Sequence, residues 1–425
     1  MENNIFKLSI EHAKKISLDL QTKIETGLKE DGTEIACLPT YINPGDELKE
    51  KVKNFEGKVL VLDWGGTNFR AAIILFKKKE KPVMLEGLKM ILSAKETKGF
   101  TGEKLHREMA SLIVQLKELD STVTHIGYCF SYETKSELDG DAILLRWSKG
   151  IYIPDMLDKL VGEPFMKYLN NYEGIKGKTE FKTIKVINDT IACLFAGLEQ
   201  PGYDSYIGLI VGTGNNMAAV IRNERIKKLD KNYKGGELIP VNLESGNMRP
   251  YSERPDSYLS EIDKEVDLIF PPKQEQLFEK AMSGKYVGAI FSNYFFEMEI
   301  DPEFDGESLT KMMSYPGIYK DKCVTIARRI YVRSAQLVAA SLTGLTLGLI
   351  SYKNEKEFDE SINEICLAAE GGLFWSEDKN GLDYNELVNK NLTIYLESFG
   401  LGHIRFRFFK LNEPNFFGSA IAALS

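Results

Sequence analysis

The sequence is poor in the residues that build metal centres, disulfide frameworks and membrane spans. Its four histidines have no metal-ligand spacing, so no zinc site is expected. Its five cysteines are scattered and form no CxxC pair, which favours reduced thiols in a cytosolic protein. The longest apolar stretch, residues 337–350, is too short to cross a bilayer, and the N-terminus lacks the apolar core of a signal peptide. These absences predict a cytoplasmic protein without a membrane partner.

Positive charge is also in deficit. The chain has 54 Lys and Arg against 62 Asp and Glu, a net charge of −8. This balance argues against nucleic acid or an anionic membrane as the main partner, although it leaves room for a local nucleotide site. The Walker pattern GxxxxGK[ST] is absent, so a P-loop kinase is excluded. With 425 residues the chain is too long for one core and long enough for two domains.

The most informative stretch covers residues 58–76, KVLVLDWGGTNFRAAIILF. Two apolar runs, which read as buried strands, flank a tight polar turn. Gly65 and Gly66 permit a sharp bend that leaves backbone N–H groups open, and such a nest attracts phosphate. Asp63 ends the first strand, where a carboxylate can hold Mg²⁺ through water. The alternative is a glycine-rich hairpin without a ligand.

A second stretch repeats this arrangement. Residues 205–221 read as strand, glycine turn and strand, and Gly214-Asn215-Asn216 aligns with Gly66-Thr67-Asn68. The separation is far longer than a solenoid repeat, so a duplicated domain with two phosphate turns is favoured over coincidence between two hairpins.

A carboxylate stands at a third strand end. Residues 183–187 read as a strand, Asn188 and Asp189 follow, and a helix covers residues 191–198. Ligands of open sheets bind at such strand ends, and a helix N-terminus favours the charged carboxylate. The alternative is that Asp189 serves only as a helix N-cap.

The rest of the chain predicts a mixed α/β protein. Helical periodicity covers residues 4–30, 321–352 and 381–397, further strands are expected at 83–93, 125–130, 362–368 and 404–409, and Gly418-Ser419 opens a final helix.

The motifs together resemble the eukaryotic-type hexokinases, sugar kinases of the actin-like ATPase superfamily. The resemblance rests on LDWGGTNFR, FSY, WSKG, NDT, VGTGNN, NLESG and QLFEK, which begin at residues 62, 130, 147, 188, 211, 242 and 276. It implies two actin-like, ribonuclease H-like domains, each a mixed β-sheet with flanking helices, around a central cleft that closes on sugar. The implied halves are residues 5–199, whose small domain is mainly 58–189, and residues 204–424.

The resemblance also assigns residues. It implies that Asp189 is the catalytic base. The implied hexose contacts are Ser131, Ser148, Lys149, Asn188, Asp189, Asn216, Glu244 and Glu279. The implied ATP and phosphate contacts are Asp63, Gly65, Gly66, Thr67, Asn68, Arg70, Thr213, Gly214, Gly371, Gly372, Gly418 and Ser419. Asp63 would bind Mg²⁺ through water, as the partner of ATP.

Each assignment has a simpler alternative. Glu279 could lie on a solvated helix face, Lys149 could be an ordinary surface lysine, and Arg70 could pair with a phosphate or merely stabilise the hairpin. The chain also departs from the family pattern: Glu133 replaces a proline, Ser245 replaces the tryptophan after the sugar glutamate, and Trp64 stands beside the metal carboxylate.

We therefore expect an ATP-dependent hexokinase that makes hexose 6-phosphate, most readily from glucose, as a monomer or homodimer. The alternatives are a sugar sensor of the same fold with weak or no turnover, and an actin-like or chaperone-like ATPase. Asp63, Asp189 and Glu279 are all present, which favours the enzyme over the sensor, and the sugar-binding set argues against the third class.

Overall fold

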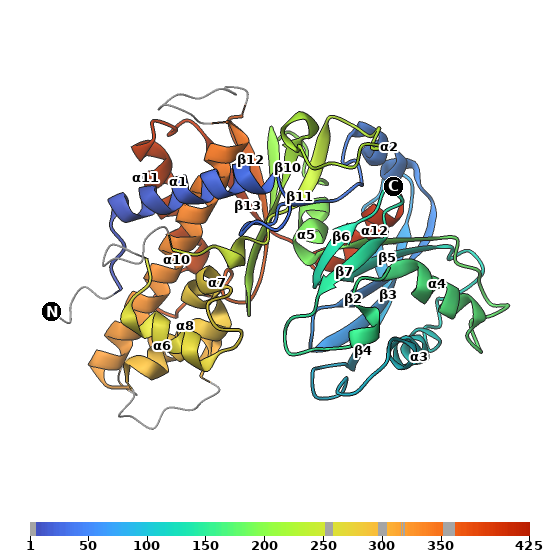
Figure 1. The fold of residues 1–425 in the computed structure, drawn as a ribbon, viewed down its shortest axis with the longest axis horizontal. Helices are drawn as coiled ribbons and strands as arrows, with labels where there is room; N and C mark the ends of the chain where they lie inside the picture. The colour runs from blue at the N-terminus through green and yellow to red at the C-terminus, as the bar shows by residue number, and fades with distance from the viewer. Residues whose placement is uncertain (1–5, 251–257, 296–303, 316, 318, 352–361) are drawn as a thin grey trace. The chain divides into compact units, whose positions relative to one another are not determined.

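The computed structural model describes residues 6–250, 258–295, 304–315, 317, 319–351 and 362–425. The fold is mixed α/β, as predicted, with a six-stranded and a five-stranded sheet (Figure 1). The chain divides into two compact units that are each assembled from separate segments. Unit 1 comprises residues 1–37, 202–217 and 243–410, and unit 2 comprises residues 38–201, 218–242 and 411–425.

The five-stranded sheet, of order β4-β3-β2-β5-β8, is the centre of unit 2. Its strands are β2 (Gly57–Trp64), β3 (Asn68–Phe76), β4 (Val83–Ile91), β5 (His125–Phe130) and β8 (Thr183–Ile187). β2 pairs antiparallel with β3 and parallel with β5, and β5 pairs parallel with β8. The carboxyl ends of β2, β5 and β8 therefore meet at one edge of this sheet.

Both faces of this sheet are covered. The helices of unit 2 are α2 (Asp46–Asn54), α3 (Gly102–Ile113), α4 (Gly162–Asn171), α5 (Asp189–Gly197) and α12 (Pro414–Ala423). Leu60, Leu62 and Trp64 alternate along β2 into a core shared with α3 and α4. On the other face α12, red in Figure 1, packs against β5 and α5. Such double cover explains why β2 reads as a continuous apolar run.

Unit 2 also contains short antiparallel strands. They are β1 (Leu38–Pro39), β6 (Glu133–Ser136), β7 (Ala142–Arg146) and β11 (Leu238–Asn242), together with most of β10 (Asn215–Arg222). β11 pairs with both β1 and β10, while β6 pairs with β7.

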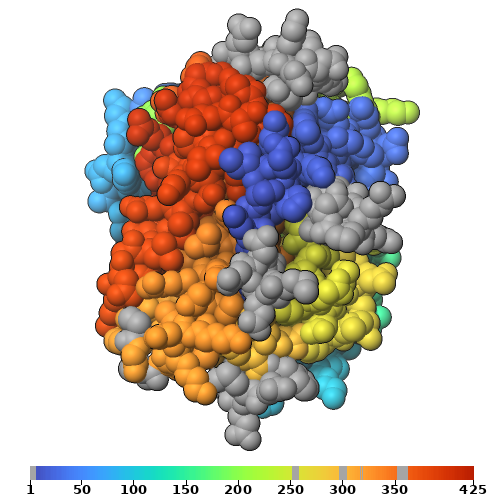
Figure 2. Space-filling view, turned by 90° about the vertical axis from the view of Figure 1, so that its left-hand side faces the viewer, coloured from blue at the N-terminus to red at the C-terminus, as the bar shows by residue number. Residues whose placement is uncertain are grey.

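Unit 1 is mostly helical. Its helices are α1 (Ile10–Gly27), α6 (Glu261–Ile269), α7 (Leu277–Met282), α8 (Gly284–Tyr294), α9 (Gly306–Ser314), α10 (Asp321–Leu349) and α11 (Tyr384–Ser398). Its strands β9 (Ser205–Val211), β12 (Glu364–Glu370) and β13 (Arg405–Lys410) are mutually parallel in the order β9-β12-β13. α10 is the central helix and packs on α1 and α11. Figure 2 shows α1, in blue, at the surface beside later residues in red-orange.

Most predicted elements are present, with several corrections. The strands at 125–130 and 183–187 match the prediction at both ends. The last helix begins at Pro414 and not at Gly418. Ile5 and Tyr352, within two predicted helices, lie outside the described residues. The chain passes between the units at several points, one of them 201–202, so neither unit is a continuous half of the sequence.

Candidate active site

The first predicted phosphate turn joins β2 to β3 in unit 2. Asp63, the second-last residue of β2, is almost fully buried, and Arg70 lies opposite it in the antiparallel register. Arg70 donates to Asp63 Oδ2 through Nε at 2.7 Å and also through Nη2. Its Nη1 donates to Glu413 Oε2 at 2.7 Å. Arg70 therefore joins the predicted metal carboxylate to the segment that leads into α12.

The chemistry of Asp63 fits a metal held mostly by water and phosphate. Burial raises the pKa of Asp63, and the charge of Arg70 opposes that rise. Its Oδ1 is buried without a conventional hydrogen-bond partner among the described residues. The part of the chain that the structure describes contains no group of three or more His, Cys, Asp or Glu that could hold a metal. A single carboxylate suits Mg²⁺, which keeps several waters and binds substrate phosphates.

The sugar-closing segment, which carries the predicted hexose contacts Ser131, Ser148 and Lys149, packs on this turn. Gly66 has φ +112°, and a Cβ there would lie 2.9 Å from Lys149 Cδ. Lys149 donates from Nζ to Ser131 O at 3.0 Å, and Ser131 N donates to Trp64 O at 3.2 Å. Lys149 is therefore an exposed residue whose ammonium group is tied to the backbone of Ser131, beside the turn. Ser148 lies next to it in the same segment and is partly exposed.

Trp64 packs beneath the turn. It is fully buried, and its Nε1 donates to Leu92 O at 3.1 Å. Its ring lies 5.1 Å from Tyr132 and 5.7 Å from Trp147. Edge-to-face contacts of this kind add stability beyond buried area. One aromatic cluster thus supports both the phosphate turn and the sugar-closing segment.

Asn188 and Asp189 stand at the carboxyl end of β8. Asn188 is the N-cap of α5, because its side chain accepts from Thr190 N at 2.9 Å. Asp189 is the first residue of the helix and accepts from Thr190 N at 2.8 Å. The alternative that Asp189 is only the N-cap is therefore wrong. Burial is the main cause of the raised pKa of Asp63, and the negative charge of Asp189 adds a smaller rise. The two carboxylates therefore interact electrostatically.

The second predicted phosphate turn, between β9 and β10, lies in unit 1 with Glu279. Glu279 Oε2 accepts from Asn215 N at 2.8 Å, and a Cβ at Gly214 would lie 2.5 Å from the same oxygen. Ser283 Oγ donates to Thr213 O at 2.9 Å. Glu279 is therefore held against the turn, and its interpretation as a solvated helix residue is wrong.

Asn216 and Glu244 belong to the same half-site. Asn216 Oδ1 accepts from Met217 N at 2.7 Å and from Ser245 N at 3.1 Å, which ties it to the residue after Glu244. Glu244 has φ +56°, in the left-handed region that non-glycine residues rarely adopt. Such local strain is common at functional sites, and here it sets the direction of the chain at Glu244.

The predicted adenosine turn, Gly371-Gly372, adjoins the second phosphate turn. Gly371 has φ +122°, and a Cβ there would lie 2.2 Å from Val211 O. Gly212 faces it, with its own Cβ position 3.2 Å from Gly371 Cα. Backbone and backbone meet so closely that only glycine fits. Gly372 has nothing within 4 Å of its Cβ position, so its side of the turn is open.

Gly418 and Ser419 have a different environment from the predicted one. They lie inside α12, where a Cβ at Gly418 would come within 1.8 Å of Ala192 O. A Cβ at Gly127 of β5 would likewise meet Ser419 O at 2.1 Å. Close packing of α12 on α5 and β5 is sufficient to require small residues here, whether or not these residues bind the nucleotide.

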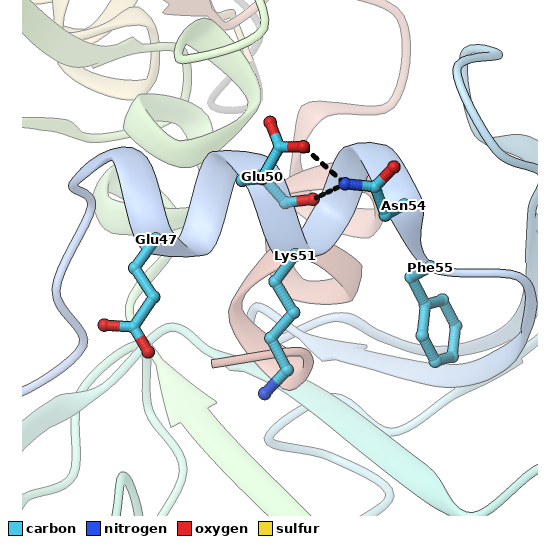
Figure 3. A pocket seen from close by; sticks show the side chains of 5 residues that line it. All are labelled: Glu47, Glu50, Lys51, Asn54 and Phe55. Atoms are coloured by element: carbon cyan, nitrogen blue, oxygen red, sulfur yellow. Dashed lines mark hydrogen bonds between the residues drawn. The ribbon is translucent and has the colours of Figure 1, made fainter.

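The predicted residues therefore fall into two groups. Unit 2 holds the first phosphate turn with Asp63 and Arg70, the sugar-closing residues, and Asn188 with Asp189. Unit 1 holds the second phosphate turn, Asn216, Glu244, Glu279 and the Gly371 turn. The described surface also has a hollow of about 500 Å³ along α2, lined by Glu47, Glu50, Lys51, Asn54 and Phe55 (Figure 3). It contains no candidate residue, and its opposite charges lie on one short helix.

Comparison with known proteins explains this arrangement. Two family models, both described as hexokinase, match residues 2–198 and 206–322. The chain belongs to the hexokinase family. Hexokinase-1 of Arabidopsis thaliana is 24% identical over 98% of this chain and 88% of that protein. Hexokinase-9 of Oryza sativa subsp. japonica is 26% identical over 73% of this chain, and that alignment spans only 61% of the rice protein.

Solved structures agree on the fold. Hexokinase from Schistosoma mansoni, solved in complex with glucose, superposes with a TM-score of 0.76 at 21% identity, covering 98% of this chain and 96% of that one. A further hexokinase crystal structure gives 0.72 at 20% identity and covers 99% of this chain and 97% of that one. The two-domain actin-like fold of hexokinases is thereby confirmed. No helix in the described ranges has the length and apolar character needed to traverse a membrane.

Sequence reasoning missed several residues of these half-sites. Glu413 binds Arg70, Thr190 donates from its hydroxyl to Asn188 at 2.7 Å, and Asn215 binds Glu279 through its backbone. The Asn-x-Thr spacing of a helix cap could have identified Thr190. No sequence signal joins Glu413 to Arg70, which stands far away in the chain.

Proposed function

We propose that this protein is an ATP-dependent hexokinase, which transfers the γ-phosphate of ATP to the 6-hydroxyl of glucose and related hexoses. The observation that carries the proposal is that two aspartates, Asp189 and Asp63, lie at the same edge of the sheet of unit 2. Asp189 stands at the end of β8 in the first turn of α5, and Asp63 is the second-last residue of β2, beside the glycine turn. Phosphoryl transfer needs a carboxylate for the hydroxyl proton and neutralised phosphates. Asp189 would supply the carboxylate, and Asp63 would hold, through water, the Mg²⁺ that neutralises the phosphates.

The residues divide the work as follows. Asp189 accepts the proton of the 6-hydroxyl as that oxygen attacks phosphorus, and Asn188 orients the sugar through its amide NH₂ group. Asn216, Glu244 and Glu279 of unit 1 bind further hydroxyls, because carboxylates and amides match a ring of hydroxyl groups. Mg²⁺ would enter with ATP, would be held through water by Asp63, and would neutralise phosphate charge.

The nucleotide is assigned to the glycine turns. The open N–H groups of Gly65, Gly66 and Thr67, and those of Thr213 and Gly214, would bind phosphates. The open side of Gly372 would accept the adenosine. Glucose as preferred hexose, a place at the first step of glycolysis and a cytoplasmic location are parts of the same proposal. The five cysteines are all buried and none of them forms a disulfide, which supports a reducing compartment.

The test is a coupled ADP-release assay with glucose, mannose, fructose and glucosamine. We expect hexose-dependent ADP release in the native protein and a loss of kcat of about 10²–10⁴ in Asp189→Ala, the range of general-base catalysis. Asp321→Asn is the matched control, since Asp321 also begins a helix and is exposed. Glucose binding without turnover in the native protein would support the sugar sensor. Full activity of Asp189→Ala would refute the proposed mechanism.

A further inference from the structure

The residue that follows Glu279 in sequence, Lys280, forms a buried ion pair with Asp267. Lys280, the next residue of α7, has a side chain only 2% exposed, and Asp267 of α6 is 9% exposed. Lys280 Nζ donates to Asp267 Oδ1 at 2.6 Å and to Pro272 O at 2.7 Å. The second carboxylate oxygen, Oδ2, accepts from Gln274 N at 2.9 Å. A lysine is rarely buried to this extent, and here its charge and its hydrogen bonds are satisfied by neighbours.

The ion pair stabilises α7, a helix that is too short to be stable without tertiary contacts. α7 contains six residues, Leu277–Met282, and a helix of this length is unstable without tertiary contacts. The preceding residue, Gln276, has a left-handed φ of +53°, so the chain enters α7 through a sharp turn. The bonds from Asp267 and Lys280 to Gln274 and Pro272 hold the segment immediately before that turn.

Glu279 lies between two anchors. Phe278 is fully buried, its ring lies 5.3 Å from Tyr258, and its N donates to Met248 O at 3.2 Å. Lys280 is anchored by Asp267. Successive residues of a helix are about 100° apart, so the two anchors together fix the rotation of α7 about its axis. That rotation decides whether the carboxylate of Glu279 meets Asn215 N.

We propose that Lys280 and Asp267 are positioning residues for Glu279 in hexose binding. The inference rests on the proposed function, because it takes Glu279 as a hexose ligand. Without the lysine charge, α7 keeps one anchor instead of two and Glu279 leaves the place set by Asn215. A ligand displaced by about 1 Å can cost up to about 10²-fold in function.

The test compares Lys280→Met with a matched control in the same unit. Lys23 also donates to carboxylates, Asp19 and Glu34 at 2.8 Å each, and to a carbonyl, Arg249 O at 2.8 Å. Lys23→Met therefore removes the same kinds of interaction from a lysine that adjoins no candidate residue in sequence. Asp267→Asn is the second test variant: it keeps the side-chain volume and removes the charge that holds Lys280.

Four quantities are measured for each variant: the glucose Kd without ATP from tryptophan fluorescence, KM and kcat with glucose, and the urea unfolding midpoint. We expect Lys280→Met and Asp267→Asn to raise the glucose Kd about tenfold to 100-fold, with KM rising by a larger factor than kcat falls. Lys23→Met is expected to lower the unfolding midpoint and to leave the glucose Kd unchanged. Lys280→Arg, which restores the charge with a different shape, should recover part of the affinity.

The outcomes separate the two proposals. An unchanged glucose Kd in Asp267→Asn and Lys280→Met would overturn the positioning role while leaving the hexokinase proposal intact. An equal loss of affinity in Lys23→Met would also overturn it, because the effect would then be a general loosening of unit 1. Absence of glucose binding by the native protein would refute the proposed function itself and this inference with it.

Discussion

Arg70 donates two hydrogen bonds to one carboxylate oxygen of Asp63, the residue proposed to hold Mg²⁺ through water. Charge-assisted bonds of this kind are stronger than neutral ones and fix the acceptor in one orientation. Arg70 thus does more than stabilise a hairpin, since it opposes the rise that burial imposes on the pKa of Asp63.

We expect Arg70→Met to move the acid side of the pH–activity profile towards higher pH. Without the guanidinium, burial raises the pKa of Asp63 further, and the charged carboxylate forms only at higher pH. A folded state that holds this proton more tightly than the unfolded state also loses stability as pH rises through the raised pKa. The measurements are kcat/KM and urea unfolding across pH.

Glu413→Gln is the control for Arg70→Met. It removes the outer partner of Arg70, whose side chain is 39% exposed, and leaves the bonds to Asp63 in place. A stability change below about 1 kcal/mol is expected, as for other exposed ion pairs. A larger pH shift in Glu413→Gln than in Arg70→Met would contradict this account.

Gly418→Ala and Gly372→Ala should have opposite effects. A methyl group at Gly418 collides with the backbone of α5, so Gly418→Ala should lower the free energy of unfolding and leave the ATP KM of the folded protein unchanged. A methyl group at Gly372 meets nothing, so Gly372→Ala should keep stability and raise the ATP KM if adenosine binds there. Thermal unfolding and ATP titrations distinguish the two. A raised ATP KM in Gly418→Ala without loss of stability would support the nucleotide role predicted for Gly418.

Trp64→Ala should destabilise unit 2 and weaken glucose binding together. The substitution empties the centre of the aromatic cluster and removes the bond to Leu92 O, for an expected loss of about 3–5 kcal/mol. Tyr152→Ala is the control, because Tyr152 is 64% exposed and belongs, like Trp64, to unit 2. Urea unfolding gives the first quantity and a glucose titration gives the second. Normal stability of Trp64→Ala would show that the cluster does not support the turn.

Acid should weaken the fold partly through His106 of α3. Burial lowers the pKa of His106 to about 4 from 6.5, and its ring lies 5.0 Å from Phe165. Between these two values the unfolded state binds the proton more readily, so this contribution is complete above pH 6.5 and is lost as pH falls towards about 4. His106→Gln should flatten that part of the stability curve. An unaltered curve would assign the acid sensitivity to other groups.

The sequence predicted the elements whose signal is local. β5 and β8 are buried runs bounded by polar residues, and both match at each end. The two glycine turns were predicted as turns between strands because glycine has few uses other than bends and close approach, and their role in binding phosphate stays a prediction. Asp189 was found because it follows a strand and opens a helix, which are neighbours along the chain.

What the sequence could not predict depends on distant contacts. α7 is too short for a periodic signal, and the buried Lys280 looks like any surface lysine until Asp267 is brought beside it. The left-handed φ of Glu244 carries no sequence mark, because only glycine and, less often, asparagine announce that conformation. Gly418 was assigned to the nucleotide although close packing on Ala192 O already requires a glycine there.

The passage of the chain between the units constrains how the protein can be made. Each unit contains segments from the beginning, middle and end of the sequence, including residues 411–425 in unit 2. α12 packs against β5 and α5, which are made more than two hundred residues earlier. During synthesis, the sheet that contains Asp63 and adjoins Asp189 therefore has one face uncovered until α12 has been made. Contacts of such long sequence separation are slow to form, and the uncovered face is apolar.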